Sequence, residues 1–199
     1  MTSDGSIERW FNIVVKAGLL ASFAVVAIWS PEVVEGKNML ARAPLFLAPA
    51  IIVPVLARVR RWDPYPHLAD ALLSLPFLLD TLGNLFGFYD RYVSTDDVLH
   101  FVNWIALVAA FHAFRYRNVD DHRDAVLLGY GFGALAIIAW ESFEWLISDD
   151  GPFAAGVPDA LSLSYGDTIG DLVMSSTGGL IGSLIGRFAI GPRLIARRR

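Results

Sequence analysis

The sequence predicts an all-α, polytopic membrane protein with six transmembrane helices. Three observations support this prediction. Of the 199 residues, 55% are hydrophobic and the mean hydropathy is +0.49, whereas soluble domains are about 45–50% apolar. The apolar residues form long blocks and do not alternate or follow a narrow stripe. Each block is close to the ~20 residues that an α-helix needs to cross the hydrocarbon of a bilayer.

The first two blocks need the most justification. The N-terminal stretch MTSDGSIERW lacks the charge pattern and the cleavage site of a signal peptide, so the first block is interpreted as a retained span. The second block contains Pro44, Pro49 and Pro54, which membrane helices tolerate when neighbours satisfy the freed carbonyl groups. The even spacing of the blocks and the lack of a repeat predict one domain over residues 1–199. The predicted spans are roughly 11–30, 40–57, 67–88, 97–115, 124–147 and 168–190.

The other four blocks combine apolar stretches with polar residues, which lie at one end of the last three blocks. The third carries Asp80 near its middle and Asn84 closer to its end. The fourth begins at STDDVLHF and continues into WIALVAAF, and the fifth runs from GALAIIAW into AWESFEWLIS. The sixth begins at SYGDTIGDLVM. Each of the last three spans is therefore polar at one end and apolar at the other.

The arginines predict the orientation. They cluster in alternate connections, which belong in the cytoplasm by the positive-inside rule. The opposite connections carry little positive charge, and residues 149–166 contain no Lys or Arg. Both termini are therefore expected in the cytoplasm. The clustered residues are Arg58, Arg60, Arg61, Arg115, Arg117, Arg123, Arg193, Arg197, Arg198 and Arg199.

Three consecutive spans carry a polar pair at the predicted outer end. Side chains three or four residues apart share a helix face, so each pair points in one direction. Terminal acids can simply meet water, but ionised groups one or two turns inside cost about 2.5–3.5 kcal/mol on insertion scales and usually face a cavity. We therefore predict a shared cavity that opens outward. The pairs are Asp96 with His100, Glu141 with Glu144, and Asp167 with Asp171; further expected lining residues are Asp80, Asn84, Trp140, Trp145 and Thr168.

Clustered carboxylates in a low dielectric either hold protons or are neutralised by a cation. Five acids and one imidazole favour a hard or borderline divalent metal such as Mn, Fe, Mg or Zn. The expected ligands are the six residues of the three pairs. The chain contains no cysteine and no Glu-x-x-His motif, which excludes thiolate sites and argues against a ferritin-type di-iron centre. No catalytic residue can be identified from the sequence.

Two other patterns concern packing and partners. Gly178, Gly182 and Gly186 form a small-residue register that allows another helix to approach closely. Packing within the bundle is the preferred interpretation, and a homo-oligomer is the alternative. Tyr89, like three tryptophans, is expected in the interfacial belt next to membrane lipids. The net charge of −4 and the dispersed arginines argue against nucleic acid as a partner.

Three motifs resemble those of the YjdF-like family of bacterial inner-membrane proteins, a family of unknown function. They are DDVLHF, ESFEW and GDTIGDLVM, and the similarity covers mainly residues 80–185. The resemblance implies a small multi-pass protein of the bacterial cytoplasmic (inner) membrane, with the acids and the histidine of these motifs as characteristic positions. It implies no reaction.

Three functions fit these features. The first is a metal-dependent enzyme that acts on a lipid or another envelope substrate. The second is a small cation or proton transporter that uses the same acids, with Asp80, Asp70 and His67 of the third span as the only hint of a polar path. The third is a non-catalytic envelope protein with a structural ion. The apolar stretches WIALVAAF and GALAIIAW argue against the transporter.

Overall fold

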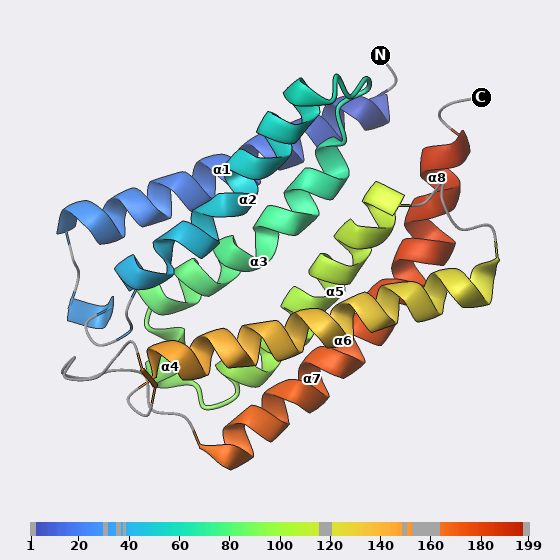
Figure 1. Ribbon diagram of the computed structural model, residues 1–199. Helices are drawn as coiled ribbons and strands as arrows, with labels where there is room; N and C mark the ends of the chain where they lie inside the picture. The colour runs from blue at the N-terminus through green and yellow to red at the C-terminus, as the bar shows by residue number, and fades with distance from the viewer. Residues whose placement is uncertain are drawn as a thin grey trace.

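The chain folds into a bundle of long helices in the computed structural model (Figure 1), which describes residues 3–29, 32–34, 37, 39–115, 121–148, 151–152 and 164–196. Six helices in this part are long and apolar enough to cross a membrane. The prediction of an all-α fold with six spans is therefore confirmed. The candidate spans are Gly5–Trp29, Arg42–Val59, His67–Leu85, Thr95–Arg115, His122–Ile147 and Tyr165–Leu194.

The helices follow the predicted order, with small differences at their ends. The third ends at Leu85 because Gly87 adopts a left-handed conformation (φ 64°), which favours glycine and ends the helix. The last span continues from α7 through a π-helical turn at Gly186–Ile190 into α8. The bounds are α1 Ser3–Trp29, a 3₁₀ turn Glu32–Val34, α2 Met39–Val59, α3 His67–Leu85, α4 Phe88–Arg91, α5 Thr95–Arg115, α6 His122–Ile147, α7 Tyr165–Ile185 and α8 Gly191–Ala196.

Two groups of helices form the bundle. An apolar core that includes Leu19, Phe23, Phe46 and Leu78 joins α1, α2 and α3. The helices α5, α6 and α7 form the second group, and the two ends of the chain lie at the same end of the bundle (Figure 1). Many large apolar side chains elsewhere are exposed on the helices, among them Leu135 and Val173, as expected of surfaces that face lipid.

The glycines of α7 allow α5 to approach closely. A Cβ atom at Gly182 would lie 2.6 Å from the carbonyl oxygen of Ile105 and 2.9 Å from its Cα. Gly178 approaches the backbone of Phe101 in the same way, and Gly186 faces the His112 side chain. The face considered for a homo-oligomer therefore contacts α5 of the same chain. Close backbone approach at small residues is a common source of contact energy between membrane helices.

A buried ion pair joins α1 to α3 near the end of the bundle that holds the termini. Lys16 Nζ lies 2.5 Å from Asp70 Oδ2, and the Asp70 side chain is fully buried. Asn12 donates to the same oxygen at 2.9 Å, and the Tyr65 hydroxyl also donates to it. Burial and the hydrogen bond to Asp70 raise the pKa of Tyr65, so the phenol stays protonated and remains a donor.

Lys16 also compensates for a proline of α2. Pro54 has no N–H to donate to the carbonyl group of Ala50, four residues earlier. Lys16 Nζ lies 3.3 Å from this carbonyl oxygen and donates to it. One ammonium group therefore contacts α2 and α3 from α1, and α2 stays helical despite three internal prolines.

The cytoplasmic location of both termini is a prediction that a reporter fusion can test. A reporter that is active only in the cytoplasm should be active when fused after Arg199 and silent when inserted at Gly156; both positions lie outside the described residues. The reason is the arginine bias of alternate connections. Activity at Gly156 together with silence after Arg199 would reverse the orientation and place the predicted cavity on the cytoplasmic side.

Candidate functional site

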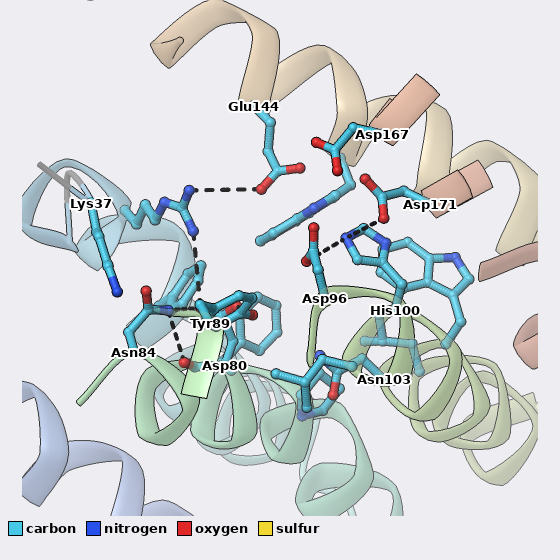
Figure 2. A pocket seen from close by; sticks show the side chains of 18 residues that line it. Lys37, Asp80, Asn84, Tyr89, Asp96, His100, Asn103, Glu144, Asp167 and Asp171 are labelled. Carbon is cyan, nitrogen blue, oxygen red and sulfur yellow. Dashed lines mark hydrogen bonds and ion pairs between the residues drawn. The ribbon is translucent and has the colours of Figure 1, made fainter. Parts of the chain in front are cut away.

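A cavity of about 240 Å³ lies at the end of the bundle opposite the termini. Residues of six helices, α2 to α7, line it together with Lys37. Its acidic residues lie near the start of α5 and α7 and near the end of α3 and α6. Figure 2 shows polar side chains from these helices converging on one space. The lining residues are Lys37, Arg42, Phe46, Pro76, Phe77, Asp80, Asn84, Tyr89, Asp96, Leu99, His100, Asn103, Trp104, Leu107, Trp140, Glu144, Asp167 and Asp171.

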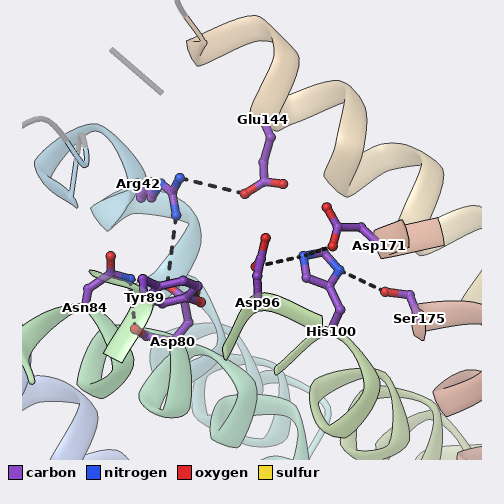
Figure 3. Close-up of polar contacts among 9 residues, drawn as sticks. All are labelled: Arg42, Asp80, Asn84, Tyr89, Asp96, His100, Glu144, Asp171 and Ser175. Atoms are coloured by element: carbon purple, nitrogen blue, oxygen red, sulfur yellow. Dashed lines mark hydrogen bonds and ion pairs between the residues drawn. The ribbon is translucent and has the colours of Figure 1, made fainter. Parts of the chain in front are cut away.

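The buried His100 stands between two carboxylates. Its Nε2 lies 3.6 Å from Asp96 Oδ1 and 3.6 Å from Asp171 Oδ1. Its Nδ1 lies 2.9 Å from the hydroxyl oxygen of Ser175 on α7 (Figure 3). A histidine that ligates a metal usually donates its other ring N–H to such a partner, which fixes the ring and its tautomer. The three ligand atoms of Asp96, His100 and Asp171 all lie within 4.8 Å of one another.

A second group shares the same histidine. Single ligand atoms of His100, Glu141 and Glu144 also lie within 4.8 Å of one another. Oε1 of Glu141 is buried and has no hydrogen-bond partner among the described residues. An acceptor in this state is costly unless a proton or a cation satisfies it. The two groups together place four carboxylates around one imidazole ring.

Arg42 supplies an internal cation on the opposite side of the cavity. Its side chain extends from the first turn of α2 between Glu144 and Asp80 (Figure 3). The guanidinium nitrogens lie 3.7 Å from Glu144 Oε1 and 4.0 Å from Asp80 Oδ2. Only 5% of Arg42 is exposed. The cation therefore offsets part of the negative charge at the Glu144 side, whereas Asp96 and Asp171 have no such partner within 4 Å apart from His100 in the described chain.

Asp80 is held by a set of local hydrogen bonds. The Tyr89 hydroxyl donates to Oδ1, and Asn84 Nδ2 lies 3.2 Å from Oδ2. Burial and the nearby Asp80 carboxylate raise the pKa of Tyr89, so the phenol remains a donor. The belt position expected for Tyr89 is therefore wrong: the turn at Gly87 directs this residue into the cavity. Asp80 lies beside Arg42 and belongs to neither carboxylate–histidine group.

The predicted site residues divide into three sets. Asp96, His100, Glu144, Asp167, Asp171, Asp80, Asn84 and Trp140 line the cavity. Of these, Asp167 is exposed at the edge of the cavity and belongs to neither candidate metal group. Glu141 belongs to one metal group but does not line the cavity.

Trp145 and Thr168, which were expected to line the cavity, do not. Trp145 is 52% exposed; one residue after Glu144 corresponds to about 100° around an α-helix, which turns the indole away. Thr168 likewise follows Asp167 by one residue, is half-buried and lies outside the lining.

Sequence reasoning missed five functional candidates: Arg42, Lys37, Asn103, Ser175 and Tyr89. Arg42 is a lone charge inside an apolar block, and the cost of burying a charge was a signal that could have identified it. Ser175 lies four residues after Asp171 and so shares its face. Asn103 lies three residues after His100 and could have been found by the same rule. No comparable periodic signal marks Lys37, which lies outside the helices.

Below the polar groups, the cavity has an apolar floor. Phe46, Phe77, Trp104, Leu107 and Trp140 lie one or two helical turns further from the polar end than Arg42, Asp80, His100 and Glu144. The rings contact one another, with centroid distances of 5.3 Å for Phe46–Phe77, 6.0 Å for Phe46–Trp140 and 6.4 Å for Trp104–Trp140. The cavity is therefore polar at one end and aromatic at the other.

Comparison with known proteins agrees with the membrane fold. Residues 12–191 match a family described as "Predicted membrane protein (DUF2238)". No curated protein and no solved structure matches the chain. The family match includes all six helices that line the cavity.

Proposed function

The chain belongs to the DUF2238 family of predicted membrane proteins. We propose that this integral membrane protein binds a divalent cation between Asp96, His100 and Asp171. The family description assigns no reaction, so the proposal rests on the site. The resemblance to inner-membrane proteins stated above supports the bacterial cytoplasmic membrane as the location.

One observation carries the proposal: Nε2 of His100 is aimed at two carboxylate oxygens, each 3.6 Å away, while Nδ1 is engaged by Ser175. These distances exceed the 2.7–2.9 Å of a charge-assisted hydrogen bond. Ligand atoms bound to one ion at about 2.0–2.2 Å must stay apart from one another in this way. An ion between the three atoms would also offset the repulsion between the two carboxylates.

The ligand set favours certain ions. Two carboxylates and one imidazole suit Mn²⁺, Fe²⁺, Mg²⁺ or Zn²⁺, whereas a copper site would favour softer sulfur ligands. Three protein ligands leave coordination positions open, which is typical of catalytic sites. Glu141 and Glu144 lie near enough to add a ligand or to receive a proton from a bound water.

A metal-dependent enzyme that acts on a lipid or another envelope substrate is the function that we favour. A bound divalent ion can polarise a phosphoryl or carbonyl oxygen or activate a water molecule. Cation or proton transport is less well supported because the cavity ends on the aromatic floor of Phe46, Trp104 and Trp140. Asp70, another acid of α3 considered for a transport path, is paired with Lys16.

The test is metal content and thermal stability of the purified protein. Wild type should bind Mn²⁺ or Zn²⁺ stoichiometrically, and its melting temperature should fall on chelation because a ligand that binds only the folded state stabilises it by about 2.7 kcal/mol at 100 times its Kd. Asp171→Asn keeps the shape of the side chain and removes one ligand charge. It should weaken metal affinity by at least about 10-fold, which is the loss typical of even indirect metal contacts.

Asp97→Asn is the matched control. Asp97 lies in the same first turn of α5 as Asp96, is exposed and belongs to neither candidate metal group. It makes the same change in charge close to the site, so its metal content and its response to chelator should equal those of wild type. The proposal fails if wild type holds no stoichiometric metal and does not respond to chelator. Equal losses in both variants would show a general charge effect in place of ligation.

A further inference from the structure

Among the described residues, Arg42 lacks the close partners that a buried guanidinium normally has. It carries five N–H donors, yet its two ion-pair distances are 3.7 and 4.0 Å. Its Nε is buried, and in the described part of the chain it has no hydrogen-bond acceptor. Unpaired buried donors cost about 1–3 kcal/mol each. Arg42 nevertheless lines the cavity, where an anionic group could accept these hydrogen bonds.

Asn103 gives a second, independent indication of a ligand. It is 9% exposed, lines the cavity and lies one turn below His100 on α5. Its Oδ1 has no hydrogen-bond partner among the described residues. Figure 2 shows Asn103 on the same side of the cavity as Asp96 and His100. A buried amide oxygen next to the candidate metal group, with no described donor, suits a ligand that places an O–H or N–H group at this depth.

The shape of the cavity limits what this ligand can be. Its ~240 Å³ far exceed the ~10–15 Å³ that, by the same definition of volume, hold one water molecule. This volume accommodates a small charged group and a short apolar segment, so the rest of a bound lipid would lie outside the cavity. The aromatic floor suits the apolar segment and Arg42 suits an anionic group, whereas Lys37 is already paired with Asp90 at 2.7 Å.

We propose that the cavity binds the phosphate headgroup of a membrane lipid, with the phosphate between Arg42 and the cation held by Asp96, His100 and Asp171. The first carbons of the lipid chain contact the floor formed by Phe46, Phe77, Trp104, Leu107 and Trp140. Arg recognises phosphate through its planar fork of donors, and a hard divalent ion is commonly bound by a few carboxylates together with substrate phosphate oxygens. This inference rests on the proposed function.

The excess of carboxylates in the cavity predicts how phosphate binding depends on the metal. Five carboxylates but only two cationic side chains line the space, so an added phosphate would be repelled in the absence of metal. Binding of the phosphate should therefore require the metal. An amphiphile with a positively charged head would show the opposite dependence, because it would compete with the metal for the same carboxylates.

The experiment uses the full chain in a maltoside detergent, which carries no phosphate, and has two stages. The first measures Mn²⁺ binding alone and tests the proposed function by itself. The second measures the affinity for octyl phosphate by calorimetry, with saturating Mn²⁺ or with chelator. Inorganic phosphate, octanol and octyltrimethylammonium serve as parallel probes for the free anion, the chain and the opposite charge. Octyl phosphate should bind at least about 10-fold more tightly with Mn²⁺ than with chelator, and at least about 10-fold more tightly than the other three probes; one such factor corresponds to 1.4 kcal/mol.

Two variants locate the ligand. Arg42→Lys keeps the positive charge but removes the planar fork, and it should weaken octyl phosphate about 10-fold with Mn²⁺ affinity unchanged. Leu107→Phe narrows the floor and should weaken octyl phosphate but not inorganic phosphate. Arg91→Lys is the control, because Arg91 is exposed on α4 and outside the lining. Retained Mn²⁺ binding shows that each variant is folded.

Several results would overturn the inference while Mn²⁺ still binds wild type. These are equal binding of octyl phosphate with and without metal, equal binding of inorganic phosphate, tighter binding of octyltrimethylammonium, or no effect of Arg42→Lys. Failure of wild type to bind Mn²⁺ would instead refute the proposed function at the first stage.

Discussion

Gly182→Leu is expected to push α5 and α7 apart and to lower the free energy of unfolding by about 3 kcal/mol or more, at or above the upper end of typical overpacking costs. The physical reason is that even a Cβ atom at this position would lie 2.6 Å from a backbone oxygen and 2.9 Å from a Cα atom of Ile105. A backbone cannot rotate away as a side chain can. Thermal unfolding of the purified protein in detergent measures the effect, and a Gly182→Ala variant should show a smaller loss of the same sign.

Gly131→Leu is the matched control for this prediction. Gly131 lies within α6, and a Cβ atom there would meet nothing within 4 Å. The same substitution should therefore be neutral, or stabilising by up to roughly 1 kcal/mol because glycine in a helix interior is unfavourable. Similar melting temperatures for the two leucine variants would show that the contact between α5 and α7 is not limited by Gly182.

Lys16→Met is expected to have a comparably large effect, a loss of about 3–5 kcal/mol, because it leaves the buried Asp70 carboxylate without its cation. The Asp70 side chain is fully buried, and in the described part of the chain it would retain only the hydrogen bonds from Asn12 and Tyr65. The substitution also removes the donor to the Ala50 carbonyl group. Chemical or thermal unfolding of the variant in detergent provides the measurement.

The double variant Lys16→Met, Asp70→Asn separates charge from packing. Removing both charges should restore most of the stability, since the main cost of the single change is the uncompensated anion. The part that does not return reports the lost hydrogen bond to Ala50. A double variant that is as unstable as Lys16→Met would show that the ion pair is not the source of the loss.

The fold could be predicted because its signals lie within continuous segments. A block of about 20 apolar residues defines a span, and polar residues three or four apart define a face of it. These two rules alone predict that Asp96 with His100, and Asp167 with Asp171, lie at one depth. The glycine register likewise indicated close helix packing, which Gly182 and Ile105 display.

The rest could not be predicted because it depends on how helices are rotated against one another. Arg42 contacts Asp80 and Glu144 from two other helices, and no local pattern links these three positions. Trp145 and Glu144 are sequence neighbours, yet one is exposed and the other lines the cavity. Tyr89 lines the cavity although the sequence predicts a belt residue. The difference arises at Gly87, where a left-handed turn precedes α4 and is not evident from the sequence.

The ion pairs of Arg42 have a consequence for the biogenesis of the protein. Its partners lie on α3 and on α6, and Glu144 follows Arg42 by about a hundred residues, which a ribosome adds in roughly 5–20 s. Asp80 emerges much earlier, so it is the first carboxylate that can accompany Arg42 into the bilayer. Arg42 can pair with its second partner, Glu144, only after α6 has been synthesised. The cavity itself is completed later still, because Asp167 and Asp171 lie on α7, in the sixth span.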